Sequence, residues 1–578
     1  MTQKRWWPVL IPVLISVGLY ASSFKNGFVW DDWLVTLDSK GKYISNIPDF
    51  FTGHTPYPFS AVWQSLNYTA WGDNARGYHF TNVLLHAGVT AVVYVLFAVL
   101  TGSRFISFGT ALLFAVHPVH AEPVAWISGY PELLYTLLFL LSLNAGVRSK
   151  GMMDGQAIVS VVCYLLALMA KPVAVTLPVV LFAALVWFKG VPIRVAVRRV
   201  MPHCVGAALW LFHIRGLIAN RISETASQGA VPFDHNYPLV VLPSVLWRYF
   251  CSFFWPWFDL SIQHDFSGAW PANLLPAFFF AAVLAGSIWM ARKKQWEAMG
   301  ILWTAVTLSP MLNWPFVAAS IHADRYLYLP SVGLCLSVAA LSARLWTKTR
   351  GRLRTAEAGA AAVMMVLLAV STLKYSAMWG DERLLYSQAI RTSKNMEYYF
   401  RNDLGTAYAR KNQFREAEAE FRRSIELNPL HVKPYNNVAW ICEKERRWDE
   451  GITFSEKAAQ LDPTSFIAFN NLGNLCMGKG DLKRAEWAYL KAIEVKPDFS
   501  SPLFNLGRLN QVTNRLDQSA GFYEKAIRAN PYQQYAHRFL GDVYLAMGNR
   551  EKARLAWGEA LRKDPDRAEI EKRLSQLQ

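Results

Sequence analysis

The chain has 578 residues, of which 53% are hydrophobic and 14% aromatic, with a mean hydropathy of +0.15. This length exceeds that of one domain, and so apolar a composition excludes an ordinary soluble protein. The net charge of +17 does not indicate nucleic-acid binding, because most of the surplus lies in short loops between apolar runs. From residue 398 onward, 29 Lys and Arg stand against 24 Asp and Glu, without a basic stripe.

Apolar runs of membrane-spanning length occupy the first two thirds of the chain. They lie at residues 6–23, 78–100, 105–121, 131–147, 156–170, 173–188, 200–217, 272–291, 297–313, 326–343 and 356–376. A run at 238–257 is interrupted by Arg248 and Pro256, so we do not count it as a span. The alternative for the first run, which follows two basic residues, is a signal peptide cleaved near "YASS".

The orientation in the membrane follows from the basic loops, which membrane proteins keep on the cytoplasmic side. The basic loops share one side only if the run at 238–257 does not cross the membrane fully, which gives eleven spans with the N-terminus inside and the last third outside. Asp31, the "HPVHAEP" loop, Lys171 and Arg325 then share the outer face. Compact loops favour a bacterial inner membrane with a periplasmic active site, and the endoplasmic reticulum membrane is the alternative.

The first polar motif, "NGFVWDDWLVTLDS" at residues 26–39, places the carboxylates of Asp31 and Asp32 between aromatic side chains. Repulsion and partial desolvation raise the pKa of one such carboxylate toward that of a general base. We therefore predict catalysis by Asp31, with Asp32 holding the loop or raising the pKa of Asp31. A metal site is the competing use of two carboxylates, and a solvated loop is the simplest alternative.

The second polar motif, "HPVHAEP", clusters His117, His120 and Glu122 at the end of the third run. Zinc ligands can have such spacing, but the two prolines break a helix and leave the loop geometry open. We favour hydrogen bonding to a sugar or phosphate, or orientation of the Asp31 loop, and we predict no metal ligand and no certain cofactor. Interfacial histidines without a function are the alternative.

Two cations, Lys171 in "MAKPVAVTLP" and Arg325 in "IHADRYLYLP", stand at the outer ends of spans. Charges in or near a membrane are costly and usually functional. Arginine can bind phosphate oxygens in pairs, so we predict that both residues contact the phosphate of a donor. For Lys171 the alternative is that the side chain reaches out to the lipid headgroups.

The last third is a repeat array. Prolines recur every 34 residues, at Pro429, Pro463, Pro497, Pro531 and Pro565. Small residues recur with the same period, where two helices of a hairpin must approach closely: Gly405, Ala439, Gly473, Gly507 and Gly541. This is the tetratricopeptide pattern, whose solenoids usually bind an extended peptide or a partner helix, and a passive spacer is the alternative.

The cysteines do not indicate a disulfide framework. Cys442 and Cys476 occupy equivalent positions in neighbouring repeats. Equivalent helices are at least ~8–10 Å apart, too far for a disulfide, so these two residues should lie in the core. The other four lie in apolar runs and are expected to be buried as small hydrophobic residues: Cys163, Cys204, Cys251 and Cys335.

The segment "MWGDERLLYSQAIRTSKNMEYYF" joins the last span to the first repeat without a Gly/Ser linker. Trp379 can anchor at the membrane interface, and the apolar residues that follow have helical spacing: Leu384, Leu385, Ala389 and Ile390. We predict a helical connection that holds the array over the outer face, and a loosely tethered array is the alternative. The chain then divides into a membrane domain at 1–376, a connector at 377–398 and five repeats at 399–578.

Five stretches now carry a family resemblance: "NGFVWDDW", "YHFTNVLLHAGVTAVVYVLF", "ALLFAVHPVHAEPVAWISG", "MAKPVAVTLPVVL" and "ADRYLYLPSVG". With the repeats behind them, they resemble the transmembrane and tetratricopeptide-repeat protein O-mannosyltransferases. The resemblance implies a GT-C glycosyltransferase fold, with Asp31 matching the catalytic acid and Arg325 matching the arginine before "YLYLP". The chain departs from the family at Asp324, where Glu is common, and at Tyr130-Pro131-Glu132, where Arg-Ala-Asp is common, which leaves the sugar and acceptor open.

The sequence thus predicts an all-α protein, a polytopic membrane bundle of about eleven spans followed by a tetratricopeptide solenoid. With the resemblance, it predicts transfer of one sugar, mannose being favoured, from a polyprenyl-phosphate donor to a Ser or Thr hydroxyl of a protein bound by the repeats. Asp31 would accept the proton of the acceptor, and a single displacement would invert configuration. The alternatives are a transferase acting on a lipid or polysaccharide, and a non-enzymatic membrane scaffold.

Overall fold

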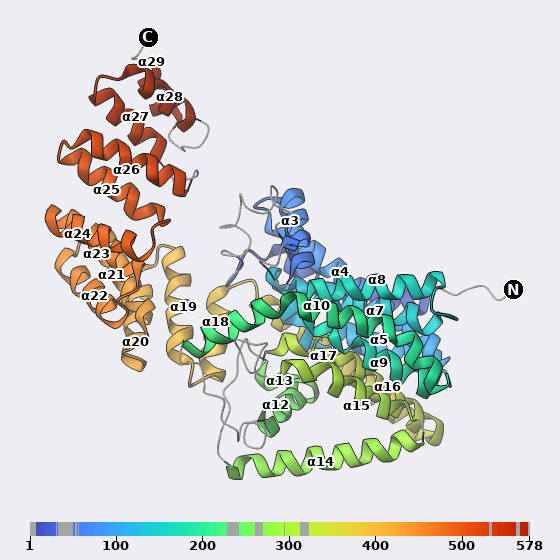
Figure 1. Ribbon diagram of the computed structural model, residues 1–578. Coiled ribbons are helices and arrows are strands. Elements are labelled where there is room, and N and C mark those ends of the chain that lie inside the picture. The colour runs from blue at the N-terminus through green and yellow to red at the C-terminus, as the bar shows by residue number, and fades with distance from the viewer. Residues whose placement is uncertain are drawn as a thin grey trace. The chain divides into compact units, whose positions relative to one another are not determined.

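The computed structural model describes residues 7–30, 32, 50–51, 55, 57–227, 242–260, 270–293, 295–312, 323–530, 535–561 and 567–575. Within these ranges the secondary structure is helical, without strands, as the sequence predicts. The helices form two compact units, Met1–Lys394 and Asn395–Gln578 (Figure 1). We call the first the membrane unit and the second the repeat array.

The long helices of the membrane unit follow the predicted apolar runs. Six segments of the described chain are long and apolar enough to cross a membrane: Trp7–Lys25, Ala75–Thr101, Ile127–Arg148, Ile193–Leu217, Leu274–Arg292 and Arg352–Met378. They correspond to α1 (Trp7–Tyr20), α4 (Ala75–Thr101), α7 (Tyr130–Arg148), α10 (Ile193–Ser227), α14 (Trp270–Arg292) and α17 (Arg352–Met378), of which α10 and α14 extend beyond their segments. The chain is therefore a multi-pass membrane protein.

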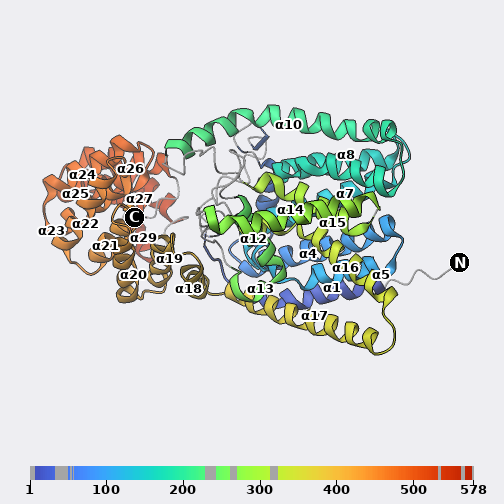
Figure 2. The ribbon, with the colours of Figure 1, turned by 90° about the horizontal axis from the view of Figure 1, so that it is seen from below.

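The remaining predicted spans coincide with shorter or less apolar helices. These are α5 (Arg104–Val116), α8 (Gly155–Ala170), α9 (Leu177–Ala183) with its π-helical extension η7 (Ala184–Phe188), α15 (Trp296–Leu308) and α16 (Ser331–Lys348). Figure 2 shows most helices of the membrane unit running side by side in broadly one direction. The number of eleven crossings stays a prediction.

Short helices join the long ones. They are η1 (Ala21–Lys25), α3 (Pro58–Trp71), η4 (Pro118–His120), α6 (Ala121–Ala125), η5 (Ile127–Gly129), η6 (Pro172–Thr176), α12 (Leu242–Phe254), α13 (Pro256–Asp259), η8 (Ser309–Met311) and η9 (Asp324–Leu327). The uncounted run at 238–257 is broken at Pro256, where α13 begins after α12 ends at Phe254, whereas Arg248 lies inside α12 and does not interrupt it. These short helices carry most of the polar motifs.

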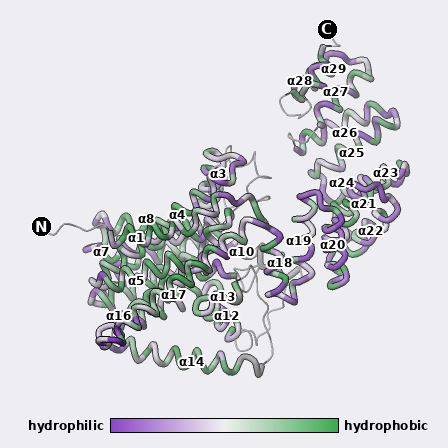
Figure 3. Tube along the Cα trace, turned by 180° about the vertical axis from the view of Figure 1, so that it is seen from behind, coloured by the Kyte–Doolittle hydropathy of each residue, from purple (hydrophilic) through white to green (hydrophobic). Residues whose placement is uncertain are grey.

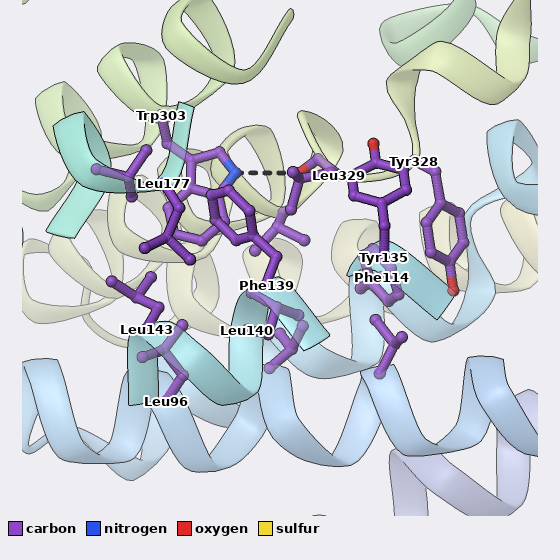
Figure 4. Packing of buried hydrophobic residues seen from close by; sticks show 14 of the residues in the cluster. Leu96, Phe114, Tyr135, Phe139, Leu140, Leu143, Leu177, Trp303, Tyr328 and Leu329 are labelled. Atoms are coloured by element: carbon purple, nitrogen blue, oxygen red, sulfur yellow. Dashed lines mark hydrogen bonds between the residues drawn. The ribbon is translucent and has the colours of Figure 1, made fainter. Parts of the chain in front are cut away.

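The core of the membrane unit is close-packed and apolar. Trp303 of α15 is fully buried, with its ring 6.4 Å from that of Phe97 and 5.9 Å from that of Phe139. Its indole N–H donates to the Leu329 carbonyl at 3.0 Å, the dashed line in Figure 4. This bond gives the Trp303 indole nitrogen, the one polar atom of the side chain, a hydrogen-bond partner that its apolar surroundings could not supply.

Apolar side chains also cover the outside of this unit. On α17, Val363, Val366 and Val370 are 61%, 62% and 57% exposed. Figure 3 shows hydrophobic residues along most of the membrane-unit helices, whereas hydrophilic stretches are frequent in the array. A helix pairs its backbone N–H and C=O groups internally, so apolar side chains on its outer face are enough to make it suitable for contact with lipid.

The burial predicted for the six cysteines is found in full at three of them, in part at two and not at one. Cys442 and Cys476 are free and buried, as is Cys335, and Cys163 and Cys251 are half-buried. Cys204 is exposed on α10, so the predicted burial is wrong at that residue.

The array consists of helical hairpins. They are α19 (Glu397–Arg410) with α20 (Phe414–Leu427), α21 (Val432–Lys444) with α22 (Trp448–Leu461), α23 (Phe466–Lys479) with α24 (Leu482–Val495), α25 (Ser500–Val512) with α26 (Leu516–Ala529), and α27 (Ala536–Ala546) with α28 (Arg550–Ala560). A last helix, α29 (Arg567–Ser575), follows. Pro429, Pro463 and Pro497 each lie shortly after the second helix of a hairpin, because proline cannot continue it.

Within a hairpin, the recurring small residue faces a ring from the second helix. A Cβ added to any of the four glycines at this position would lie much too close to a ring atom. The pairs are Gly405 with Phe421 at 2.6 Å, Gly473 with Tyr489 at 2.4 Å, Gly507 with Tyr523 at 2.6 Å and Gly541 with Trp557 at 2.3 Å. At the equivalent positions, the second hairpin has Ala439 instead of glycine and Ser455 instead of an aromatic residue. The larger residue on the first helix is thus matched by a smaller residue on the second.

We predict that Ser455→Tyr destabilises the second hairpin, because the new ring meets the Ala439 methyl, and overpacking costs ~1–3 kcal/mol. The double variant Ala439→Gly/Ser455→Tyr recreates the pair found in the other hairpins and should recover most of this loss. Amide hydrogen exchange in α21 and α22 of the full chain measures both. A double variant that exchanges as fast as Ser455→Tyr would show that the pair does not set the packing.

Candidate active site

A cavity of about 300 Å³ lies in the membrane unit, and we call it the polar cavity. Its walls come from helix ends and short helices: Ser60 and Gln64 of α3, Trp126 and Ser128 at η5, Tyr130 and Glu132 of α7, Lys171 after α8, and Arg325 of η9. Asn82 of α4 anchors one wall by donating to the carbonyls of Trp126 and Ile127 at 2.8 and 3.2 Å. Segments far apart in sequence thus meet around one polar space.

The prolines of the "HPVHAEP" motif explain the local fold. Pro118 begins η4, and Pro123 lies in the first turn of α6, where a missing backbone N–H costs nothing. The chain therefore turns twice within a few residues. The two turns point His117, His120 and Glu122 to different neighbours, so the three side chains do not act as one cluster.

Glu122 and Arg325 form a buried ion pair. Glu122 accepts hydrogen bonds from the Arg325 backbone N–H, at 2.8 Å, and from its guanidinium. The side chains are only 5% and 15% exposed. Burial raises the pKa of Glu122 to about 7, and the guanidinium opposes this rise. A guanidinium has five N–H donors, more than this carboxylate occupies, so Arg325 can also bind an anion in the cavity.

Lys171 is held in a second ion pair. Its ammonium lies 2.5 and 2.6 Å from the two carboxylate oxygens of Glu132, and 5.3 Å from the centre of the Tyr326 ring. Both members of the pair line the cavity. The ammonium therefore faces the polar cavity and not the lipid headgroups. The sequence marked Glu132 only as a departure from the family pattern and missed its role as the partner of Lys171.

We call the described residues on either side of Asp31, which are Val29, Trp30 and Asp32, the acidic loop, and this loop is tied to the same wall. Asp31 lies outside the described residues, but its neighbour Asp32 is fully buried. One oxygen of Asp32 accepts from the backbone N–H and the hydroxyl of Ser128, at 2.9 and 2.6 Å, and the other accepts from the Val29 N–H at 3.0 Å. Ser128 lines the cavity, so Asp32 is anchored at the cavity wall.

Three indoles pack together beside these ion pairs. The Trp126 ring stacks on Trp30 and on Trp379, with centroids 5.0 and 5.7 Å apart, and the Arg325 guanidinium lies 5.5 Å from Trp126 and 5.8 Å from Trp30. Stacked rings beside a cation add cation–π attraction and a rigid apolar wall. Trp379 is 5% exposed, so its predicted role as an interfacial anchor is wrong.

The two histidines are buried and bind protein groups. His117 Nε2 contacts the Phe253 carbonyl at 2.9 Å, and His120 contacts the Phe114 carbonyl and the Ser331 hydroxyl at 2.9 and 2.8 Å. They brace neighbouring elements against each other, and neither lines the polar cavity. Among the described residues, no group of three His, Cys, Asp or Glu side chains could hold a metal ion.

Comparison with known proteins adds two findings. Models of the tetratricopeptide repeat match residues 402–466, 467–499 and 534–567. The chain is 24% identical to the protein O-mannosyl-transferase TMTC3 of Mus musculus, over 91% of this chain and 64% of the mouse protein. It is 22% identical to the protein O-mannosyl-transferase TMTC2 of Homo sapiens, over 89% of this chain and 73% of that protein.

The predicted family resemblance is confirmed. It covers nearly the whole chain and includes both the membrane unit and the array. The chain spans about 64% of the length of the first of these family members. Among solved structures, that of the pilus biogenesis factor PilW is 18% identical and covers 37% of this chain and 95% of its own, with a TM-score of 0.31.

The Glu122–Arg325 pair yields a stability prediction. Arg325→Met leaves a buried carboxylate without its cation, and breaking a buried pair costs ~3–5 kcal/mol. Because the stranded Glu122 then binds a proton more tightly when folded than when unfolded, the loss should grow as the pH rises from about 5 to about 8. Thermal unfolding in detergent measures this effect.

Two controls accompany that measurement. Glu122→Gln/Arg325→Met removes the titrating group, so its loss should not depend on pH over that range. Arg423→Met breaks a pair whose side chains are 51% and 62% exposed, and it should cost less than ~1 kcal/mol. An equal loss for Arg325→Met and Arg423→Met would show that the buried pair contributes no more than a surface pair.

Proposed function

We propose that the protein is a membrane glycosyltransferase that moves one sugar, mannose being favoured, from a polyprenyl-phosphate donor to a hydroxyl of a protein acceptor. One observation carries this proposal: the polar cavity joins two oriented cations to the wall that holds the acidic loop. The similar proteins named protein O-mannosyl-transferases support the choice of reaction. A GT-C fold is proposed from the same resemblance.

Arg325 and Lys171 would bind the donor phosphate. Each is already paired with a glutamate, which compensates its charge and fixes its direction, so neither cation must be ordered when the donor arrives. Fixed donors aimed at a developing charge stabilise a transition state more than mobile ones do. As the bond between sugar and phosphate breaks, negative charge grows on the lipid phosphate, and these two cations would stabilise it.

Asp31 would act as the general base. In a single displacement it accepts the hydroxyl proton while the acceptor oxygen attacks the anomeric carbon and the lipid phosphate leaves, so the configuration inverts. The support is that both chain neighbours of Asp31 contact cavity residues: Trp30 stacks on Trp126, and Asp32 binds Ser128. Asp32 would hold the loop and would not itself exchange a proton.

The repeat array would bind the acceptor protein. Its hairpins match tetratricopeptide models, and such solenoids commonly hold extended peptides. Loop charges favour the non-cytoplasmic side for both the cavity and the array. The bacterial inner membrane and the periplasmic orientation stay predictions from the sequence.

Asp31→Asn should lower transfer by ~10²–10⁴-fold, because an amide cannot accept the acceptor proton. The measurement supplies membranes with labelled polyprenyl-phosphate mannose and follows the label on proteins by gel and mass spectrometry. Asp73→Asn, an exposed acid in a turn of the same unit, is the matched control and should keep full activity. Normal transfer by a correctly inserted Asp31→Asn protein would remove Asp31 from the mechanism.

Presentation of the acceptor by the array can be tested with a flexible insert of ~15 Gly/Ser residues, which spans ~20 Å on average and removes orientation. It belongs after Lys394, at the boundary of the two units, where it leaves the membrane unit complete. Transfer to folded-protein acceptors should then fall sharply, while transfer to a short soluble peptide persists. Unchanged transfer to both acceptors would mean that the array does not present the substrate.

A further inference from the structure

The corner between α17 and the next helix, α18 (Glu382–Thr392), lies against the acidic loop. Asp381 caps α18 by accepting from the Arg383 N–H at 3.0 Å. Leu385, Tyr386 and Ala389 give this helix a buried face, and Leu385 lines a small gap together with Glu122. Thus α18, which the sequence suggested only as a connector, packs against the elements that hold the candidate site.

Glu382 of this corner binds the acidic loop directly. Its Oε1 accepts a hydrogen bond from the Trp30 backbone N–H at 3.0 Å, across 352 residues of sequence. Trp30 immediately precedes Asp31 and has φ = +56°. A bulky L-residue rarely adopts this left-handed conformation, and such strain persists only where the surroundings enforce it.

Two further sets of contacts hold Trp30 in this left-handed conformation. Its indole packs against Trp126 and Trp379, with centroids 5.0 and 6.4 Å away. Gly380 approaches the chain before Trp30 so closely that an added Cβ would lie 2.5 Å from the Asn26 side-chain oxygen. The carboxylate of Glu382 and the indole stack therefore hold Trp30, the glycine corner confines Asn26 before it, and Ser128 holds Asp32.

We propose that Glu382 is a positioning residue of the transferase, which holds the backbone before Asp31 in its strained conformation. This inference rests on the proposed function. Without the carboxylate, the Trp30 N–H loses its acceptor and the strained residue can relax, which displaces the Trp30 backbone relative to Trp126 at the cavity wall. The donor-binding cations have their own carboxylate partners, so donor binding should be unaffected.

The test compares Glu382→Ala and Glu382→Gln in the full chain, with Leu384→Ala as a control on the exposed side of α18. Small displacements of reacting groups can cost ~10²-fold, so Glu382→Ala should lower kcat by about that factor without changing the KM for the donor. Glu382→Gln keeps an oxygen acceptor for the Trp30 N–H and should retain most of the rate. Leu384→Ala should behave as the unchanged protein.

A second measurement is independent of activity. Amide hydrogen exchange at Trp30 reports the bond itself, and it should be faster in Glu382→Ala than in Glu382→Gln or the unchanged protein. If the unchanged protein transfers no sugar, the proposed function fails, and the exchange data still test the contact. If it is active, the inference is overturned by an unchanged kcat in Glu382→Ala, by a loss confined to KM, or by a loss of rate without faster exchange at Trp30.

Discussion

Burial of charge in pairs is the constraint on which the membrane unit depends. Moving an isolated ion into an apolar region costs several kcal/mol even after relaxation, so a buried charge needs an opposite charge or several hydrogen-bond donors around it. Glu122 meets Arg325 across 203 residues, and Glu132 meets Lys171 across 39. These matches draw the ends of separate helices to one place, and the polar cavity is the space between them. The same ion pairs fix the orientation of the Lys171 and Arg325 side chains that line the cavity.

Much of the fold could be predicted because its signals are local and periodic. The 34-residue spacing of Pro429, Pro463 and Pro497 marks hairpin ends that the structure shows, since a proline stops a helix wherever it stands. Apolar runs likewise predicted the positions of the long helices. Helix length was less predictable: α5 and α15 are 13 residues each, because local turns and not hydropathy end them.

The candidate site could be predicted only in part, because its contacts join distant segments. Lys171 and Arg325 stood out as charges among apolar residues, and both line the cavity. Nothing local to Glu132 or Glu382 revealed their partners, and Trp379 had the signature of an interfacial anchor although a ring stack buries it. His117 and His120 resembled ligands, yet their nitrogens bind backbone and hydroxyl groups of neighbouring elements.

The compensated pair in the second hairpin limits how the array can recombine. Joining α21 to a second helix from another hairpin would place a large ring where the Ala439 methyl leaves no room, and joining α22 to a glycine-bearing first helix would leave a hole beside Ser455. A whole hairpin carries both halves of its match. For the second hairpin the unit of exchange is therefore the whole hairpin: a crossover between α21 and α22 separates Ala439 from Ser455, whereas a crossover in the turns on either side of this hairpin keeps them together.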